Sequence, residues 1–161
     1  MLPACGGDDE KPRATSSPTV PVVLPSGTPT PKPPATKPTE LVRTDLIEGT
    51  GRLALPGNTL TVNYIGAHFD GKVFDSSYDQ GDHPLSFTLG GERVIRGWDE
   101  GLVGMRAGGR RQLVIPPEMG YGPEGGGPGH PIGPNETLIF VVDLISVDDG
   151  LLGGGNTFAP N

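Results

Sequence analysis

The chain has 161 residues, which is enough for one ordinary domain with tails, and its composition is uneven along its length. Residues 1–40 hold 10 of the 19 prolines and no aromatic residue, so they cannot bury enough apolar surface to offset the entropy of ordering. Their four acidic and four basic residues cancel, which leaves the net charge of −7 on the remainder. We expect no nucleic-acid partner, because an acidic domain repels a phosphate backbone.

The composition divides the chain into three parts. Residues 1–40 are predicted to be a disordered tether rich in Pro, Thr and Ser, 41–149 the folded domain, and 150–161 a Gly-rich C-terminal tail. From Thr15 to Thr39 prolines recur at short intervals, which favours extended polyproline-II-like conformations of about 3.1 Å per residue. We interpret this stretch as a passive linker rather than a Pro-rich recognition motif.

Cys5 is the only cysteine, so no internal disulfide can form. The run Leu2-Pro3-Ala4-Cys5-Gly6 is similar to the end of a bacterial lipobox, in which the cysteine receives a lipid after the signal peptide is cleaved. We therefore expect lipidation at Cys5 and an extracytoplasmic protein attached to the bacterial cell membrane only through that lipid. The alternative is an ordinary thiol in the tail of a cytoplasmic protein. No apolar run approaches the roughly 20 residues that a membrane-spanning helix needs.

Period-2 patterns and turn signals predict six strands in the folded part. The turn-forming run Glu48-Gly49-Thr50-Gly51 ends the first strand, and Asp70-Gly71 is a hairpin signal before the third. The last strand has a near-continuous apolar run, which indicates a central position in the sheet. In chain order the predicted strands are 41–47, 60–65, 72–74, 86–89, 111–115 and 137–145.

Only one segment has helical spacing. Val94, Ile95, Trp98 and Leu102 form one apolar stripe over about two turns. Glycines inside this segment weaken it as an isolated helix, so it needs a sheet to lie on. The predicted fold class is α+β, a curved and mostly antiparallel β-sheet wrapped around one short α-helix.

Several kinds of catalytic chemistry have no support in the sequence. His68, His83 and His130 stand far apart without metal-ligand spacing, so we expect no metal and no cofactor. There is no G-x-S-x-G elbow and no Walker loop, and the one cysteine lies in the predicted tether. A covalent or metal-dependent mechanism therefore has few residues to use.

Five short segments follow one another along the folded part. They are 63–66 (NYIG), 70–77 (DGKVFDSS), 94–102 (VIRGWDEGL), 120–122 (GYG) and 134–140 (PNETLIF). In this order, over about residues 41–149, they resemble the FKBP family of peptidyl-prolyl cis-trans isomerases. The resemblance implies a strongly bent antiparallel sheet and an apolar pocket, between helix and sheet, that binds a proline ring. It also implies prolyl segments of client proteins as partners and macrolide immunosuppressants as further ligands; we expect a monomer.

Site residues are transferred from the family only where its motifs match. The resemblance implies that Trp98 forms the pocket floor and that Val94 and Ile95 line the rim, with the Ile95 N–H donating to a substrate carbonyl. It further implies that the Tyr121 hydroxyl bonds the bound peptide. The remaining residues implied are the aromatic walls Tyr64, Phe74 and Phe140, the carboxylate Asp75, and Leu85 and Ile132, the latter on an overhanging loop.

Each assignment has a structural alternative. Trp98, Phe74 and Phe140 are ordinary core residues in any small β protein, Asp75 suits a turn cap, and Tyr121 a turn. Four departures from the family pattern also lie near the site: Leu85 in place of an aromatic residue, Arg93 in place of glutamate, the longer segment around Gln80, and Gly133 in place of proline.

The function that these residues predict is peptidyl-prolyl cis-trans isomerisation. The pocket is expected to accelerate rotation of X–Pro bonds in folding proteins by binding the twisted amide among apolar aromatic side chains. The alternative is a proline-peptide-binding or chaperone module with little turnover.

Overall fold

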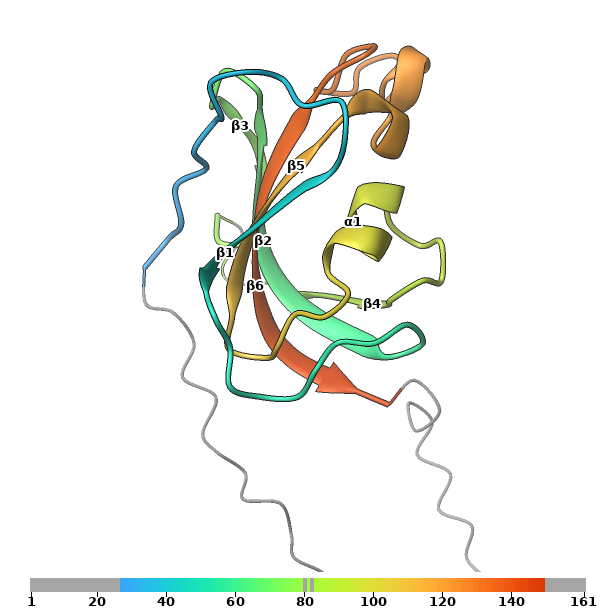
Figure 1. The fold of residues 1–161 in the computed structure, drawn as a ribbon. Helices are drawn as coiled ribbons and strands as arrows, with labels where there is room; N and C mark the ends of the chain where they lie inside the picture. The colour runs from blue at the N-terminus through green and yellow to red at the C-terminus, as the bar shows by residue number, and fades with distance from the viewer. Residues whose placement is uncertain (1–26, 80, 82, 150–161) are drawn as a thin grey trace, which may run out of the picture.

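A computed structural model describes residues 27–79, 81 and 83–149 (Figure 1). The predictions for Cys5 and for the tail 150–161 lie outside these residues. No helix in the described part of the chain is long and apolar enough to cross a membrane. The elements are β1 (Val42–Ile47), β2 (Thr59–His68), β3 (Val73–Ser76), β4 (Leu85–Thr88), α1 (Arg96–Gly101), β5 (Arg110–Ile115), β6 (Leu138–Asp148) and two short 3-10 turns, η1 (Pro117–Met119) and η2 (Gly122–Glu124).

The six strands form one antiparallel sheet in the order β1-β5-β6-β2-β3, with β4 also paired to β2. β4 pairs with the first half of β2, where Leu60 faces Phe87 in the register, and β3 pairs with the second half, where Gly66 faces Asp75. A register shift between Thr61 and Val62 interrupts the pairing of β2 with β6, and such bulges bend and twist a sheet. The sheet curves around α1, as Figure 1 shows, and the predicted fold class is confirmed.

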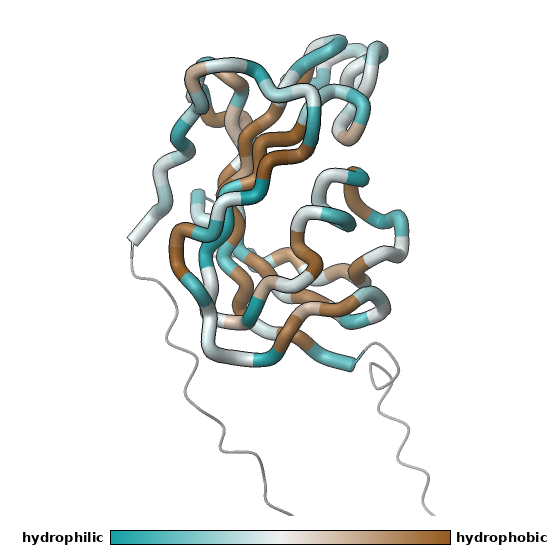
Figure 2. Tube along the Cα trace, in the orientation of Figure 1, coloured by the Kyte–Doolittle hydropathy of each residue, from teal (hydrophilic) through white to brown (hydrophobic). Residues whose placement is uncertain are grey.

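The main core lies between α1 and one face of the sheet. Alternate residues of the central strands β2, β5 and β6 belong to this core, as the period-2 pattern predicts. The hydrophobic stretches in Figure 2 accordingly concentrate along the central strands. The strand side chains in this core are Leu60, Val62, Phe87, Leu113, Ile115, Leu138, Phe140, Val142, Leu144 and Val147.

The glycines of α1 are explained by its packing against β5. A Cβ on Gly97 would lie 2.5 Å from Ile115 Cγ2, and one on Gly101 would lie 2.8 Å from Leu113 Cδ2. Both distances are far inside carbon–carbon contact, so only glycine lets the helix approach this closely. The helix also begins later than the apolar stripe predicts, because Ile95 is its extended N-cap and Val94 precedes it.

Residues 27–40 differ from the prediction that the whole stretch 1–40 is a disordered tether. Pro29 and Pro31 are buried, and the backbone of Lys32 is hydrogen-bonded to the side chain of Gln112 in β5. Prolines can bury apolar surface without needing partners for a backbone N–H, which they lack. The composition of this stretch indicates that it has no hydrophobic core of its own. It cannot indicate that part of the stretch is held by a residue of the sheet, Gln112.

Candidate functional site

An apolar pocket with a volume of about 200 Å³ lies between α1 and the sheet. Its lining comes from β2, β3, β4, β6, the loop before α1, α1 itself and the turn between η1 and η2. These elements meet only because the sheet bends around the helix. The lining residues are Tyr64, Phe74, Asp75, Leu85, Arg93, Val94, Ile95, Trp98, Tyr121 and Phe140.

Four of the five aromatic rings that line the pocket pack edge to face in succession, and the most buried of them, Trp98, is 4% exposed. The ring centroid of Trp98 lies 5.2 Å from that of Tyr64 and 5.3 Å from that of Phe140, with interplanar angles of 77° and 88°. Phe74 stands against Phe140 at 5.8 Å and 88°. T-shaped pairs at these distances are the favoured arrangement of aromatic rings, so the wall of the pocket is held rigidly. The buried Trp98 Nε1–H has no hydrogen-bond partner among the described residues.

Gly66 makes room for two of these rings. It lies on β2, two residues after Tyr64 and on the same face. A Cβ there would lie 2.7 Å from Phe74 Cζ and 2.8 Å from Phe140 Cε1. Glycine at this position therefore lets both phenylalanines lie directly against the strand.

The polar groups of the pocket are few. The Tyr64 hydroxyl donates to Asp75 Oδ2 at 2.7 Å. Burial and then this bond to Asp75 raise the pKa of Tyr64 above its ordinary value, so Tyr64 stays a neutral donor. Burial and then the charge of Asp75 raise the pKa of Tyr121. The Tyr121 hydroxyl donates to no group in the described ranges, which leaves it available to a ligand.

The rim beside α1 carries a second available donor. The Ile95 carbonyl accepts from the N–H groups of Trp98 and Asp99 at 2.9 and 3.3 Å. The Ile95 N–H, by contrast, forms no hydrogen bond within the part of the chain that the structure covers. The carboxylate of Asp99 fixes the preceding loop by accepting from the N–H groups of Gly90 and Glu92 at 2.8 and 3.1 Å.

The structure brings together all but one of the predicted pocket residues that it describes. Ile132 is the exception: its side chain is 2% exposed and packs in the main core rather than lining the pocket. The loop closes on itself, with the Gly126 N–H donating to the Ile132 carbonyl at 3.0 Å. The substrate-contacting role that the resemblance implies for Ile132 stays a prediction.

Two functional positions were not predicted. Arg93, noted only as a departure from the family pattern, lines the pocket, and Asp99 holds the loop that leads to the rim. Arg93 could have been found from its place next to Val94. Asp99 gave no signal, because a polar residue in the first turn of a helix is common.

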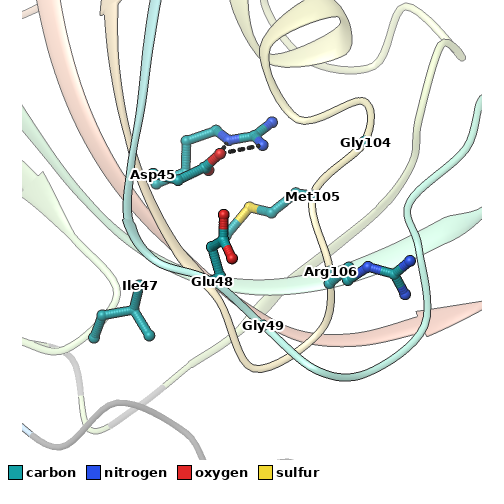
Figure 3. Close-up of a pocket in the computed structure, with 8 residues that line it drawn as sticks. Asp45, Ile47, Glu48, Gly49, Gly104, Met105 and Arg106 are labelled. Atoms are coloured by element: carbon teal, nitrogen blue, oxygen red, sulfur yellow. Dashed lines mark hydrogen bonds and ion pairs between the residues drawn. The ribbon is translucent and has the colours of Figure 1, made fainter.

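A second hollow, of about 240 Å³, lies where β1 meets the loop before β5 (Figure 3). Asp45, Glu48 and Met105 point into it, whereas Ile47 and Arg106 point away. Arg111 is paired with Asp45, with one N–O distance of 3.0 Å, and also donates to the carbonyls of Gly101 and Val103 at 2.9 and 3.1 Å. These bonds tie the end of α1 to β1 and β5, so the hollow has a structural explanation.

Residues 27–79, 81 and 83–149 contain no group of three or more His, Cys, Asp or Glu side chains that could hold a metal ion. His68 is paired with Glu136, and its ring also stands 5.1 Å from that of Phe74. Of the other two histidines, His130 packs against Tyr121 with ring centroids 5.2 Å apart.

A bent antiparallel sheet with an aromatic pocket over one short helix defines the class of prolyl isomerases that the sequence resembles. The family described as FKBP-type peptidyl-prolyl cis-trans isomerase matches residues 51–145. The chain therefore belongs to this family, and the activity of the family is that of an enzyme, peptidyl-prolyl cis-trans isomerisation.

Known proteins agree with this assignment. An FK506-binding protein of Streptomyces anulatus is 49% identical over 111 residues, which are 68% of this chain and 88% of that protein. A probable FK506-binding protein of Corynebacterium glutamicum is 51% identical over 110 residues, again 68% of this chain and 88% of the relative. The crystal structure of FkpA from Escherichia coli superposes with a TM-score of 0.62 at 45% identity, covering 75% of this chain and 53% of that one.

Proposed function

We propose that the aromatic pocket catalyses rotation of X–Pro bonds by binding the twisted amide more tightly than either planar form. The observation that supports this most directly is the composition of the pocket: five aromatic rings and one carboxylate, with that carboxylate already hydrogen-bonded to Tyr64. Such a pocket offers no pair of groups arranged for proton transfer. None is required, because isomerisation cleaves no bond.

The barrier of about 20 kcal/mol for rotation arises from amide resonance, which is lost when the bond twists. A planar amide has the larger dipole and the better hydrated oxygen, so transfer into an apolar pocket disfavours the planar form more than the twisted one. Catalysis needs only this difference in binding. The edges of Tyr64, Phe74 and Phe140 present C–H groups that can donate weakly to the turning carbonyl oxygen, a secondary contribution.

Two groups are suited to hold the flanking backbone while the central bond turns. They are the Ile95 N–H and the Tyr121 hydroxyl, neither of which is bonded within the described chain. Asp75 orients Tyr64 through their hydrogen bond and is assigned no acid or base role. The substrate class is therefore a prolyl segment of an unfolded or folding chain, with the proline ring above Trp98.

The substitution Tyr121→Phe tests this assignment, with Tyr78→Phe as the matched control. Each removes one hydroxyl, but the Tyr78 hydroxyl bonds Asp143 outside the pocket. Because one hydrogen bond contributes about 0.5–1.5 kcal/mol, we expect Tyr121→Phe to lower kcat/KM roughly 2- to 10-fold in a protease-coupled assay of a short X–Pro peptide, without lowering Tm. Tyr78→Phe should lower Tm and leave kcat/KM unchanged.

Two results of this assay would count against the proposal. If Tyr121→Phe loses stability together with activity, its hydroxyl is structural and does not contact the peptide. If the wild-type chain binds the prolyl peptide without accelerating its isomerisation, the chain is instead a proline-binding module. That alternative draws on the departures at Leu85, at Arg93 and in the Gly-rich loop that ends at Gly133; Leu85 and Arg93 lie in the pocket lining.

A further inference from the structure

The face of the sheet away from α1 carries an apolar strip of its own. Its five residues lie on the three central strands and are cross-strand neighbours: Ile65 pairs with Val141, and Ile139 pairs with both Ala67 and Val114. They do not belong to the core around α1, yet they are buried to between 0% and 4% exposure. We call Ile65, Ala67, Val114, Ile139 and Val141 the back-face strip.

Residues 27–40 run along this side of the sheet (Figure 1). Burial alternates along the start of the segment: Pro29 and Pro31 are buried, and Thr28, Thr30 and Lys32 are exposed. An extended chain presents alternate residues to one surface, so both prolines face the sheet. Figure 2 shows the segment as neutral to hydrophilic, because the hydropathy scale gives proline a mildly hydrophilic value even where its ring is buried.

A side-chain amide fixes the backbone of the segment. The Lys32 N–H donates to Gln112 Oε1 at 2.9 Å, and Gln112 Nε2 donates to the Lys32 carbonyl at 2.8 Å. Gln112 lies beside the back-face strip, opposite Val141 in the register of β5 and β6. In the run Pro31-Lys32-Pro33 only Lys32 has an N–H, so this pair of bonds uses the one donor that the run offers.

Charged groups hold the segment on either side of Lys32. Arg110 donates through Nη2 to the Gly27 carbonyl at 2.9 Å. The same guanidinium is held by Asp143 through bonds of 2.6 and 2.7 Å. At the other end, Lys37 Nζ lies 5.5 Å from the centre of the Phe69 ring, within cation–π range.

We propose that the back-face strip and Gln112 form a second proline-recognition site, separate from the isomerase pocket. Its ligand is an extended Pro-Xaa-Pro-Lys-Pro segment, and in this chain residues 29–33 occupy it. The strip supplies surface for alternate proline rings, and Gln112 recognises the backbone between two prolines. The Pro-rich stretch is then a bound ligand from residue 27 onward.

Amide hydrogen exchange of Lys32 in the full chain tests this proposal. We expect the Lys32 N–H to be protected in the wild type, and both Pro29→Ala/Pro31→Ala and Gln112→Ala to speed its exchange roughly tenfold or more. Thr30→Ala is the matched control, since it changes an exposed residue between the two prolines and should leave exchange unaltered. Turnover of a prolyl peptide should stay at the wild-type rate in all three variants. Exchange at the rate of an unstructured peptide in the wild type, or no effect of either variant, would overturn the proposal.

A synthetic peptide tests recognition separately from the covalent link. A peptide of residues 27–40, added at millimolar concentration to the full-length Pro29→Ala/Pro31→Ala variant, should shift the side-chain amide resonances of Gln112. The same peptide with alanine in place of both prolines should not. Absence of a shift, or equal shifts from the two peptides, contradicts specific recognition of proline. Lys32 protection that is lost on dilution of the wild type contradicts occupancy by the chain's own segment.

Discussion

At the scale of single residues, the shape of the pocket depends on a glycine, Gly66, as much as on the aromatic side chains. Tyr64 and Asp75 supply the internal hydrogen bond, at 2.7 Å, that sets the orientation of one wall. Gly66 supplies the space that the other wall occupies, since any side chain there would meet Phe74 and Phe140. The role of Gly66 is thus to permit a contact between other residues.

We predict that Gly66→Ala displaces both phenylalanine rings and lowers kcat/KM roughly 10- to 100-fold, because small misplacements of a binding wall cost this much. Overpacking should also reduce the free energy of unfolding by about 1–3 kcal/mol. Steady-state kinetics and urea unfolding measure the two effects. Thr61→Ala, which removes a partly exposed side chain from the same strand, should change neither by much. A Gly66→Ala variant with wild-type kinetics and stability would falsify the role assigned to Gly66.

At the scale of elements, the contact between α1 and β5 decides the depth of the pocket. α1 has only six residues and two glycines, too little for stability in isolation. Its position is set by Gly97 against Ile115 and by Trp98 against the aromatic rings. The helix is therefore held by packing and not by its own propensity.

The substitution Gly97→Ala separates the contribution of packing against β5 from that of intrinsic helix propensity. Alanine raises intrinsic helix stability by about 1 kcal/mol relative to glycine, but the new methyl group would overlap Ile115, at a typical cost of about 1–3 kcal/mol. We predict net destabilisation, measured by chemical unfolding, together with weaker peptide binding as Trp98 moves outward. Arg96→Ala breaks only the exposed pair with Glu100 and should cost about 0.5 kcal/mol or less. Stabilisation by Gly97→Ala would mean that propensity outweighs packing here.

At the scale of the whole molecule, all three tyrosines of the chain are held in their neutral form. Burial is the largest cause of the raised pKa of Tyr64, Tyr78 and Tyr121, followed by bonds or charges from Asp75 or Asp143. Tyr78 lies outside the pocket, beside the ion pair of Arg110 and Asp143. Ionisation of these tyrosines at alkaline pH is therefore disfavoured both in the pocket and outside it.

This response can be measured. A pKa that folding raises gives stability that is fully present below the unfolded pKa of about 10 and is lost as pH rises toward the folded value. We predict that Tm falls above about pH 10, and less steeply in Tyr78→Phe. Tyrosinate absorbance should show little ionisation of the folded chain at pH 10, where about half of the tyrosines of an unfolded chain ionise. Half-ionisation of the native protein at that pH would contradict the burial of these side chains.

The sequence by itself determined the strands, the helix and most of the pocket lining, because local patterns report which residues are apolar and which faces are buried. The near-continuous run of β6 predicted a central strand, and the structure confirms it: Phe140 faces α1 while Ile139 and Val141 face the other side. Only the tertiary structure decided which surface each face meets. Ile132 packs in the core, Val94 and Ile95 precede the helix at the rim of the pocket, and Pro29 and Pro31 are buried. A pattern along the chain cannot specify these contacts, since each depends on a partner far away in sequence.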